Sequence, residues 1–328
     1  MERIKIGIIG AGYIGSLHAM TLARDERVHL AAVTDIEAER AKRLARASGA
    51  LAVTSAEELI EKVEAVYITT PNTMHTDLAL AAIGAGHHVF CEKPMTTSLA
   101  DAQKVLDAAR NSDRVFQVGH NRRFAPAYVE LKKMLVESRP HSAHIKMNRG
   151  ELINPAWVGD QNMTGGFLYE TTIHMLDMMR FLFGEVTELD CASSMHEYSE
   201  EDDFSALLRF ADGFHATLAS SADASWLFPF ERVEVFCHHT TIITREMESI
   251  TTSCALDGRH TTQSMQQFSK EEKWGYAQED AAFVASIIEG AEAKVTALDG
   301  YRSVELVDAC YRSARSGERV RFDAGGPW

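Results

Sequence analysis

The first residues suited to chemistry lie close to the N-terminus. A G-x-G-x-x-G motif spans Gly10, Gly12, Tyr13, Ile14 and Gly15. Its first glycine permits a tight turn, its second lets the backbone approach a pyrophosphate, and its third allows a helix to pack closely on a strand. Asp35 follows 20 residues after Gly15, where a carboxylate can accept hydrogen bonds from the adenosine ribose diol. The combination predicts a dinucleotide-binding turn rather than an ordinary turn in which Asp35 only caps a helix.

The acid also bears on which dinucleotide binds. A 2′-phosphate would be repelled by the carboxylate of Asp35, and Ile36 beside it brings no compensating positive charge. Arg40 and Arg43 lie further along the next expected helix, within conceivable reach of such a phosphate. The sequence therefore favours NAD over NADP.

Three further polar segments follow expected strands, at the carboxyl ends where ligands bind in open α/β sheets. We expect cofactor contacts from Thr70, Pro71, Asn72, His75, Glu92, Lys93 and Asn121. The Lys93 ammonium is suited to donate hydrogen bonds to a substrate oxygen and to stabilise developing alkoxide character. The alternative is a surface lysine paired with Glu92. Arg122 is expected to contact the substrate or the nicotinamide ribose.

A carboxylate and an imidazole form the second chemical group. Glu170 and His174 stand four residues apart in an expected helix, so both project from one face. Oxidation of a carbinol needs a base for the hydroxyl proton, and histidine titrates near working pH. We expect His174 to be that base and Glu170 to bind a substrate hydroxyl or orient the imidazole. The alternative is a packing histidine with a local glutamate partner.

The residues before the glycine pair Gly165-Gly166 suggest a substrate class. Trp157, Gln161 and Asn162 offer one aromatic face and two amides, and Trp226 lies further along the chain. Polyols stack their C–H faces on aromatic rings and take directed hydrogen bonds at their hydroxyls. We therefore expect these residues to bind a polyol or sugar, although Trp157 is equally suited to packing.

The elements that must position these residues change in character along the chain. Up to residue 120, six apolar runs alternate with amphipathic helical stretches, which is typical of a doubly wound parallel sheet. Strands are expected at 4–9, 28–34, 50–53, 65–69, 87–90 and 115–118, and helices at 13–24, 37–48, 74–85 and 99–110. The fold class is α/β, with an NAD-binding Rossmann domain over residues 1–120.

The later part follows another pattern. A strand is expected at 142–150 and a long helix at 166–183, and then strands at 188–196, 204–210, 215–221, 232–236 and 240–245 follow one another without intervening helices. Helices at 277–289 and 300–316 and a short strand at 319–322 close the chain. This order predicts an α+β domain over residues 121–328 with a large open, mostly antiparallel sheet for substrate binding and oligomerisation.

The motifs together resemble those of the Gfo/Idh/MocA oxidoreductases, the family of glucose–fructose oxidoreductase and inositol dehydrogenase. The resemblance rests on the N-terminal glycines, 70–72 with His75, 92–94, 119–124, 165–174 and the tail 295–300. It implies that Lys93 acts at the reacting centre, that the Lys93–Pro94 bond is cis, and that the large sheet forms a homodimer or homotetramer. Two departures stand out: Glu170 replaces the usual Asp, and Cys237-His238-His239 replaces a glycine-containing turn.

Composition limits the partners. The formal net charge is −14 and the pI is about 5.5, so an average surface repels phosphate backbones and anionic membranes, and neither nucleic acid nor membrane is an expected partner. The N-terminus has no secretory leader pattern. Five widely spaced cysteines without a CxxC pair fit a reducing compartment, so we expect a cytoplasmic protein. Neither His238-His239 nor His141 with His144 has metal-site spacing, and no metal is expected.

These observations predict an NAD-dependent oxidoreductase that moves a hydride between nicotinamide and a carbinol carbon of a sugar, sugar derivative or inositol. A second hypothesis is an NAD-dependent glycoside hydrolase, in which transient oxidation acidifies a neighbouring carbon and permits elimination. A third is a non-catalytic dinucleotide-sensing regulator, against which the presence of Lys93 and His174 counts.

Overall fold

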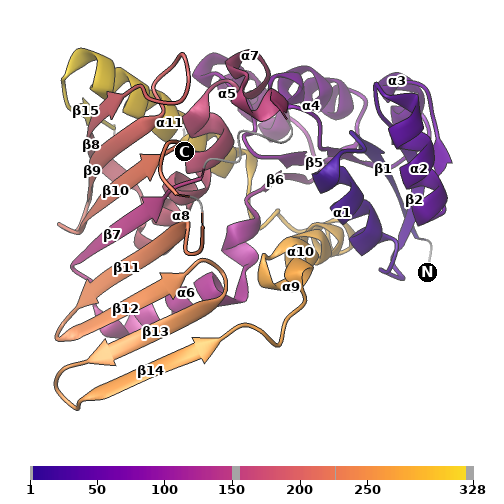
Figure 1. Cartoon of the computed structure of the whole chain (residues 1–328). Helices are drawn as coiled ribbons and strands as arrows, with labels where there is room; N and C mark the ends of the chain where they lie inside the picture. The colour runs from indigo at the N-terminus through magenta and orange to yellow at the C-terminus, as the bar shows by residue number, and fades with distance from the viewer. Residues whose placement is uncertain (1–2, 150–155, 226, 323–328) are drawn as a thin grey trace. The chain divides into compact units, whose positions relative to one another are not determined.

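The computed structural model describes residues 3–149, 156–225 and 227–322 (Figure 1). The chain forms two compact units, each built from two stretches of sequence. The first comprises Met1–Asn121 and Gly275–Val304, and the second comprises Arg122–Trp274 and Glu305–Trp328. Each unit has its own sheet.

The first unit contains a six-stranded sheet in the order β3-β2-β1-β4-β5-β6, in which every strand pairing is parallel. Its strands are β1 (Ile4–Ile9), β2 (Val28–Thr34), β3 (Leu51–Ala52), β4 (Ala65–Ile68), β5 (His88–Glu92) and β6 (Phe116–Gly119). Its helices include α1 (Tyr13–Leu22), α2 (Ala38–Ser48), α3 (Ala56–Ile60), α4 (His75–Gly84), α5 (Leu99–Arg110) and α10 (Tyr276–Glu289). The predicted doubly wound Rossmann sheet is confirmed.

Strands of this sheet are apolar on both faces because helices cover both. The four residues of β4 are all buried, and Tyr67 at its centre stacks on Phe90 of β5 with ring centroids 4.4 Å apart. Phe283 of α10 packs edge-on against Tyr67 at 5.4 Å. The core of the unit therefore includes a ring contributed more than 200 residues later in the chain.

Residues 275–304 also accept hydrogen bonds, through their backbone carbonyls, from the edge strand β6. The Val118 N–H of β6 donates to the Val295 carbonyl at 3.0 Å, and the Gln117 amide donates to the Glu279 carbonyl at 3.0 Å. Because residues 275–304 complete this unit, independent folding of residues 1–120 as a domain stays a prediction.

The second unit contains a nine-stranded sheet in the order β14-β13-β12-β11-β7-β10-β9-β8-β15. The β7–β10 pairing is parallel and the other pairings are antiparallel, so the predicted mostly antiparallel sheet is confirmed. Its strands are β7 (Ser142–Met147), β8 (Val186–Ser194), β9 (Asp203–Phe210), β10 (His215–Ser221), β11 (Glu231–Cys237), β12 (Thr240–Arg245), β13 (Ser249–Cys254), β14 (Arg259–Ser264) and β15 (Val320–Arg321).

Helices cover one face of this sheet (Figure 1). Among them, α6 (Pro126–Ser138) contacts β12 and β13, and α8 (Ile173–Phe183) contacts β7. The unit also contains the short helices α7 (Gln161–Thr164) and α9 (Lys270–Lys273), and α11 (Ala297–Ser316) runs from the first unit into the second. Burial alternates along the strands: in β7, Ala143, Ile145 and Met147 are buried beneath helices, whereas His144 is exposed on the other face. This is the alternation expected of an antiparallel sheet that packs on one side only.

The expected helix over 166–183 begins differently from the prediction. Leu168–Thr172 forms a π-helical turn, and the α-helix α8 starts only at Ile173. Single π-turns inside helices widen the backbone locally and are frequent at functional sites. Glu170 lies in the π-turn and His174 in the first α-turn, so the spacing of four residues does not run through a regular α-helix.

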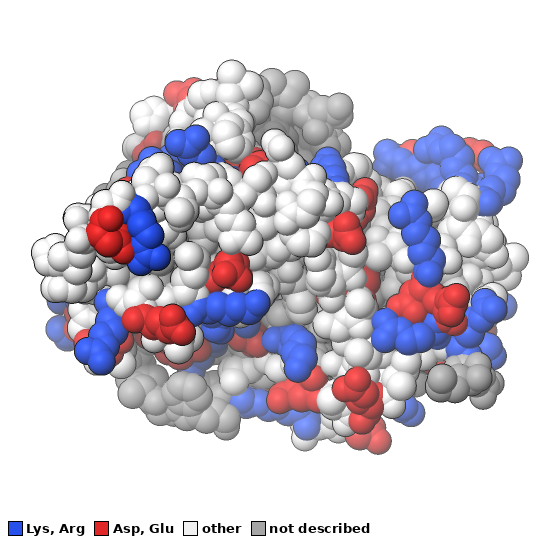
Figure 2. All heavy atoms as spheres, turned by 90° about the horizontal axis from the view of Figure 1, so that it is seen from below, with Lys and Arg blue, Asp and Glu red and all other residues white. Residues whose placement is uncertain are grey.

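Charges of both signs intermingle on the face drawn in Figure 2, where Lys and Arg side chains lie among Asp and Glu. Over the described residues, no helix combines the length and apolar character that a membrane crossing requires.

Candidate functional site

The glycine-rich turn between β1 and α1 has the geometry of a pyrophosphate cradle. Gly10 has φ +101°, and a Cβ placed there would lie 2.5 Å from the Thr69 carbonyl oxygen. A Cβ on Gly15 would lie 1.9 Å from the Gly10 carbonyl oxygen, so both positions require glycine. A Cβ on Gly12 would meet no atom within 4 Å. The backbone at Gly12, the N-cap of α1, is therefore open to a ligand at a helix N-terminus.

Asp35 follows directly after β2 and is held against this turn. Its Oδ2 accepts a hydrogen bond from the Ala11 N–H at 2.7 Å, and its Oδ1 accepts one from the Glu37 N–H at 2.8 Å. Each oxygen keeps a lone pair for a further donor. Ile36 beside it is 91% exposed, and Arg40 forms an exposed ion pair with Glu37 at 2.7 Å.

The ends of β4 and β5 carry the next predicted segments. The hydroxyl of Thr70 is buried and has no hydrogen-bond partner among the described residues, which suits contact with a bound nucleotide. Asn72 is buried, and the Lys93–Pro94 bond is cis, as the resemblance implied. Lys93 itself is half-buried at the carboxyl end of β5.

His75, which we expected to contact the cofactor, is fully buried between these segments. Its Nδ1 lies 2.7 Å from the Pro94 carbonyl oxygen and its Nε2 lies 2.9 Å from the Thr70 carbonyl oxygen. Burial lowers the pKa of His75. The side chain thus joins the two strand ends, and direct contact with a nucleotide stays a prediction.

The first unit also contains a buried acid–imidazole cluster made of His18, Glu92, Glu279 and Asp280. No motif or regular spacing in the sequence indicates that these residues meet. His18 of α1 has its Nδ1 2.7 Å from Asp280 Oδ1 and its Nε2 3.0 Å from Glu92 Oε1. Burial alone lowers the pKa of His18, but the two carboxylates outweigh it and raise that pKa well above its usual value. Glu279 of α10 is also fully buried, and its carboxyl oxygens have no hydrogen-bond partner among the described residues.

Within the described residues, His18, Glu92 and Glu279 form the one group with metal-site composition, with one ligand atom from each lying within 4.8 Å of the others. Both ring nitrogens of His18 already face carboxylates at hydrogen-bond distance. His18, Glu92 and Asp280 therefore form a hydrogen-bonded cluster, and the Glu279 carboxyl lies beside it without a hydrogen bond among the described residues.

In the second unit, the glycine pair before the π-turn is also conformationally required. Gly165 has φ +83° and Gly166 has φ +120°. A Cβ on Gly166 would lie 2.8 Å from both Glu200 Oε2 and the Tyr311 hydroxyl. The turn is thus packed closely on two polar side chains from elsewhere in the unit.

Glu170 is half-buried in the π-turn and His174 is buried in α8. The turn is tied to the sheet by Thr172, whose hydroxyl lies 2.7 Å from that of Ser220 in β10, and the Ser220 hydroxyl also donates to the Met147 carbonyl at 2.7 Å. Asp177 supports the same helix through a buried bidentate ion pair with Arg123, at 2.6 and 2.8 Å. These contacts fix the backbone that carries both predicted side chains.

The loop 195–202 adds residues that sequence reasoning missed. Asp202 accepts backbone N–H groups of His196, Glu197 and Tyr198 at 2.6–2.9 Å, which orders the loop. The Tyr198 hydroxyl is buried without a hydrogen-bond partner among the described residues, and burial raises its pKa, with Glu170 among the nearby charges. Burial also raises the pKa of Glu200. No spacing in the sequence links this loop to Glu170.

Arg122, which we expected to contact the substrate or the nicotinamide ribose, forms a buried ion pair within the second unit, and the expected contact stays a prediction. It is 2% exposed and donates to Glu231 Oε2 through Nε at 2.9 Å and Nη2 at 2.7 Å. The Tyr128 hydroxyl donates to the other oxygen of Glu231 at 2.8 Å. The Arg122 guanidinium is therefore paired within the second unit, because a buried charge needs a partner of opposite charge. The preceding residue, Asn121, which we expected to contact the cofactor, is buried in the first unit.

The expected polyol contacts lie on short helices of the second unit. Trp157 is half-buried in η3 (Ala156–Gly159), and Gln161 is exposed at the start of α7. The Asn162 amide donates to Asp160 Oδ1 at 2.9 Å, within a helix N-cap. Trp226 lies outside the described residues. Contact of Trp157, Gln161 and Asn162 with a substrate stays a prediction.

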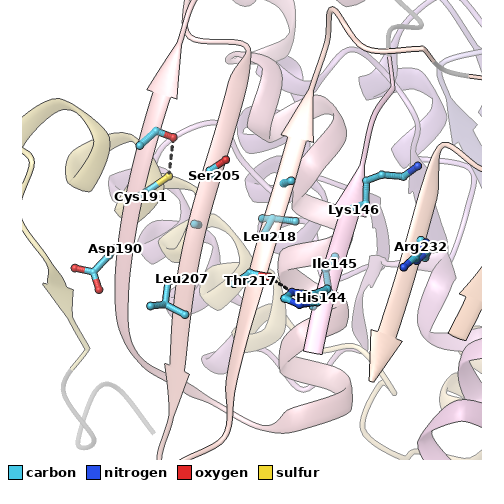
Figure 3. A pocket seen from close by; sticks show the side chains of 13 residues that line it. His144, Ile145, Lys146, Asp190, Cys191, Ser205, Leu207, Thr217, Leu218 and Arg232 are labelled. Carbon is cyan, nitrogen blue, oxygen red and sulfur yellow. Dashed lines mark hydrogen bonds between the residues drawn. The ribbon is translucent and has the colours of Figure 1, made fainter. Parts of the chain in front are cut away.

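A hollow of about 760 Å³ lies on the other face of the large sheet. Figure 3 shows His144, Lys146, Leu207, Thr217 and Arg232 along it, with His144 bonded to Thr217. These side chains alternate with the residues buried under the helices. The hollow is therefore a feature of the sheet face that no helix of the described residues covers, and it is separate from the π-turn that carries Glu170.

Comparisons with known proteins match the whole of this arrangement. A model of an oxidoreductase family with an NAD-binding Rossmann fold covers residues 4–120, and the model of its C-terminal α/β domain covers residues 133–322. The chain belongs to the Gfo/Idh/MocA oxidoreductase family.

Curated relatives in the family align over nearly their full length. An inositol 2-dehydrogenase of Rhizobium meliloti is 27% identical over 97% of this chain and 98% of its own. A myo-inositol 2-dehydrogenase of Thermotoga maritima is 26% identical over 98% and 99%. A solved structure of levoglucosan dehydrogenase with NADH and levoglucosan superposes with a TM-score of 0.88 at 21% identity, covering 98% of this chain and 100% of that one, and shows the shared fold.

The segment Cys237-His238-His239, expected to depart from the family pattern, lies at a tight turn. His238 and His239 form the two-residue turn between β11 and β12, and His239 has φ +50°. A histidine thus takes up the left-handed conformation that glycine supplies more easily.

Proposed function

We propose that the protein is an NAD-dependent dehydrogenase that oxidises a carbinol carbon of a cyclitol or sugar. The observation that carries this proposal is a complete dinucleotide turn followed by Lys93 at the end of β5, in a member of the Gfo/Idh/MocA family. The inositol 2-dehydrogenase relatives, aligned over nearly the whole chain, support a cyclitol or sugar as substrate.

The residues of the first unit fit the cofactor. The open backbone at Gly12 and the N-terminus of α1 would hold the pyrophosphate, and Asp35 would accept the ribose hydroxyls. The orphaned Thr70 hydroxyl offers a further contact. When bound, the nicotinamide supplies the hydride acceptor. NAD is preferred over NADP because Asp35 is fixed by two backbone N–H groups and cannot readily turn away from a 2′-phosphate.

The proton chemistry falls to the protein. Lys93 donates a hydrogen bond to the reacting oxygen and stabilises the negative charge that develops as its proton leaves. His174 takes that proton in the oxidative direction and returns it in the reductive one. Glu170 binds a neighbouring substrate hydroxyl, and its side chain, one methylene longer than the Asp usual in the family, shifts the choice among polyols.

The test is NADH absorbance with NAD and a panel of inositols, aldoses, sugar acids and aminosugars, run with the wild type, Lys93→Ala and His174→Ala. NADH formed with one substrate class and lost in both variants supports the proposal. NAD binding without NADH formation on any substrate would contradict it, and release of sugar without net NADH would indicate the glycosidase chemistry.

We also propose that the helix-free face of the large sheet is a homodimer or homotetramer interface. It presents Leu207 and the shallow hollow of Figure 3 between charged side chains of both signs, Asp190, Lys146 and Arg232. Light scattering tests this, and a mass near 36.4 kDa would contradict it. The five free cysteines and the use of NAD support a cytoplasmic location.

A further inference from the structure

A continuous series of short contacts leads from the late segment of the chain to the backbone of Lys93. Asp280 of α10 holds His18 Nδ1 at 2.7 Å, and His18 Nε2 lies 3.0 Å from Glu92 Oε1. The other carboxylate oxygen of Glu92 accepts the Lys93 N–H at 3.2 Å. All of these residues belong to the first unit. The side chain of Glu92 therefore links a buried imidazole to the peptide N–H of the residue proposed to act on substrate.

A second histidine contacts the backbone one residue after Lys93. His75 Nδ1 lies 2.7 Å from the carbonyl oxygen of Pro94, the residue that follows Lys93. His18 and His75 are both 0% exposed, so neither competes with water for its partners. The N–H of Lys93 and the carbonyl of the next residue, Pro94, are thus both held by buried side chains.

The space around Glu92 is closed from the neighbouring strand. A Cβ on Gly119 of β6 would lie 2.9 Å from Glu92 Cδ and Oε1. Only a residue without a side chain allows the carboxylate to occupy this place between His18 and Lys93. Gly119 is therefore a further determinant of where Glu92 lies.

We propose that His18 is a positioning residue for the reaction: held by Asp280, it fixes the Glu92 carboxylate, which in turn fixes the Lys93 backbone and so aims the Lys93 side chain. This inference rests on the proposed role of Lys93. A displacement of about 1 Å in a group that contacts the reacting atoms can lower turnover 100-fold, so such support has a catalytic value beyond stability.

The groups that face His18 come from three further elements. Glu92 lies on β5, Glu279 and Asp280 lie on α10, and the Tyr67 ring of β4 lies 5.4 Å from the imidazole. Three carboxyls around one imidazole cannot all remain charged in a buried site, and Glu279 is the one without a hydrogen bond to His18. Burial also raises the pKa of Glu279 well above its usual value, so Glu279 binds a proton more readily than a solvated glutamate does.

Two conservative variants test the inference on the full-length protein. Gly119→Ala displaces the Glu92 carboxylate without changing any charge, and His18→Gln keeps a donor for Glu92 but loses the ring geometry. His18→Leu removes the contact entirely, and His29→Gln, at an exposed position of β2, is the matched control. The first measurement is hydrogen exchange at the Lys93 amide, which needs neither cofactor nor substrate. The second is kcat and the KM for NAD across pH.

We expect Lys93 amide protection to fall about tenfold or more in Gly119→Ala and His18→Leu, with His18→Gln intermediate and His29→Gln unchanged. We also expect kcat to fall in the same order while the KM for NAD changes less than about twofold. Unchanged protection and kcat in folded Gly119→Ala and His18→Gln would overturn the inference. Full turnover in Lys93→Ala would overturn instead the proposed function of Lys93, and the exchange measurement would still decide whether His18 fixes its backbone.

Discussion

The carboxylate of Asp35 accepts a 2.7 Å hydrogen bond from the backbone N–H of Ala11, between the first two glycines of the dinucleotide turn. The acid proposed to select the ribose and the turn proposed to receive the pyrophosphate are thus directly joined. A change at Asp35 acts on both, so cofactor choice and cofactor affinity are expected to move together.

We expect Asp35→Ser combined with Ile36→Arg to raise the KM for NAD at least about tenfold and to permit turnover with NADP. The variant removes the charge that repels a 2′-phosphate and adds a cation at an exposed position. Steady-state kinetics with both cofactors measure the change, with Glu39→Gln on the exposed face of α2 as control. An unaltered ratio of kcat/KM for NAD and NADP would show that Asp35 does not select the cofactor.

Lys93→Ala is expected to lower kcat by about 100- to 1000-fold, the usual effect of removing one donor to a developing oxyanion. Lys93→Arg keeps the charge but changes the donor geometry, and we expect it to recover only part of the loss. Lys62→Ala, at an exposed position, serves as control. NAD binding measured by calorimetry should remain, because the proposed hydrogen bond serves the reacting oxygen. A Lys93→Ala variant with wild-type kcat would refute the role.

His174→Asn is expected to lower kcat by about 100- to 10 000-fold and to remove the acidic limb of the pH profile for oxidation. The reason is that a base must be unprotonated to accept the hydroxyl proton. His215→Asn, at an exposed position of β10, is the control. If the acidic limb survives in His174→Asn, another group is the base.

Arg122→Met is expected to cost about 3–5 kcal/mol of unfolding free energy, because it leaves Glu231 buried without its ion partner. The double variant Arg122→Met, Glu231→Met should be closer to the wild type, since both charges are gone. Urea unfolding monitored by circular dichroism measures both. A large rise in substrate KM with undiminished stability would restore Arg122 to the substrate site and contradict the structural assignment.

The acid–imidazole cluster predicts a particular dependence of stability on pH. The raised pKa of His18 gives stability that is fully present below the ordinary histidine pKa and is lost as pH rises through the raised value. Burial also raises the pKa of Glu279, so this carboxyl binds its proton more tightly in the folded state and stability again falls with rising pH. The thermal midpoint should therefore fall as pH rises above the ordinary glutamate pKa, through Glu279, and further above the ordinary histidine pKa, through His18. Glu279→Gln should remove the first part of this fall, and an unchanged profile in Glu279→Gln would show that Glu279 does not bind its proton more tightly in the folded state.

The local periodicity of apolar residues was sufficient to predict most of the fold. The six parallel strands and the large antiparallel sheet follow from apolar runs whose period is readable over a few residues. The strand β14 was not predicted because none of its residues is buried, and β13 was not predicted because only Ile250 of its six residues is buried. The helix α6 was not predicted although Pro126 marks its first turn. The glycine turn could likewise be predicted, because its constraint is local.

Pairings between distant residues could not be predicted in this way. His18 and Asp280 are separated by 262 positions, and no spacing rule connects them. The ion pair of Arg122 with Glu231 could not be predicted either, because the two residues lie 109 positions apart in the sequence. The π-turn was read as α-helix because one extra residue per turn changes the apolar pattern little over five residues.

The return of residues 275–304 to the first unit has a consequence for biosynthesis. A nascent chain that has emerged only as far as Asn121 carries His18 without Asp280, and Tyr67 and Phe90 without Phe283. The ribosome must therefore complete almost the entire polypeptide before the nucleotide-binding half can acquire its final interior. Until then Tyr67 and Phe90 lack the Phe283 ring and His18 lacks Asp280, and apolar surface that is exposed in this way during synthesis is prone to aggregate.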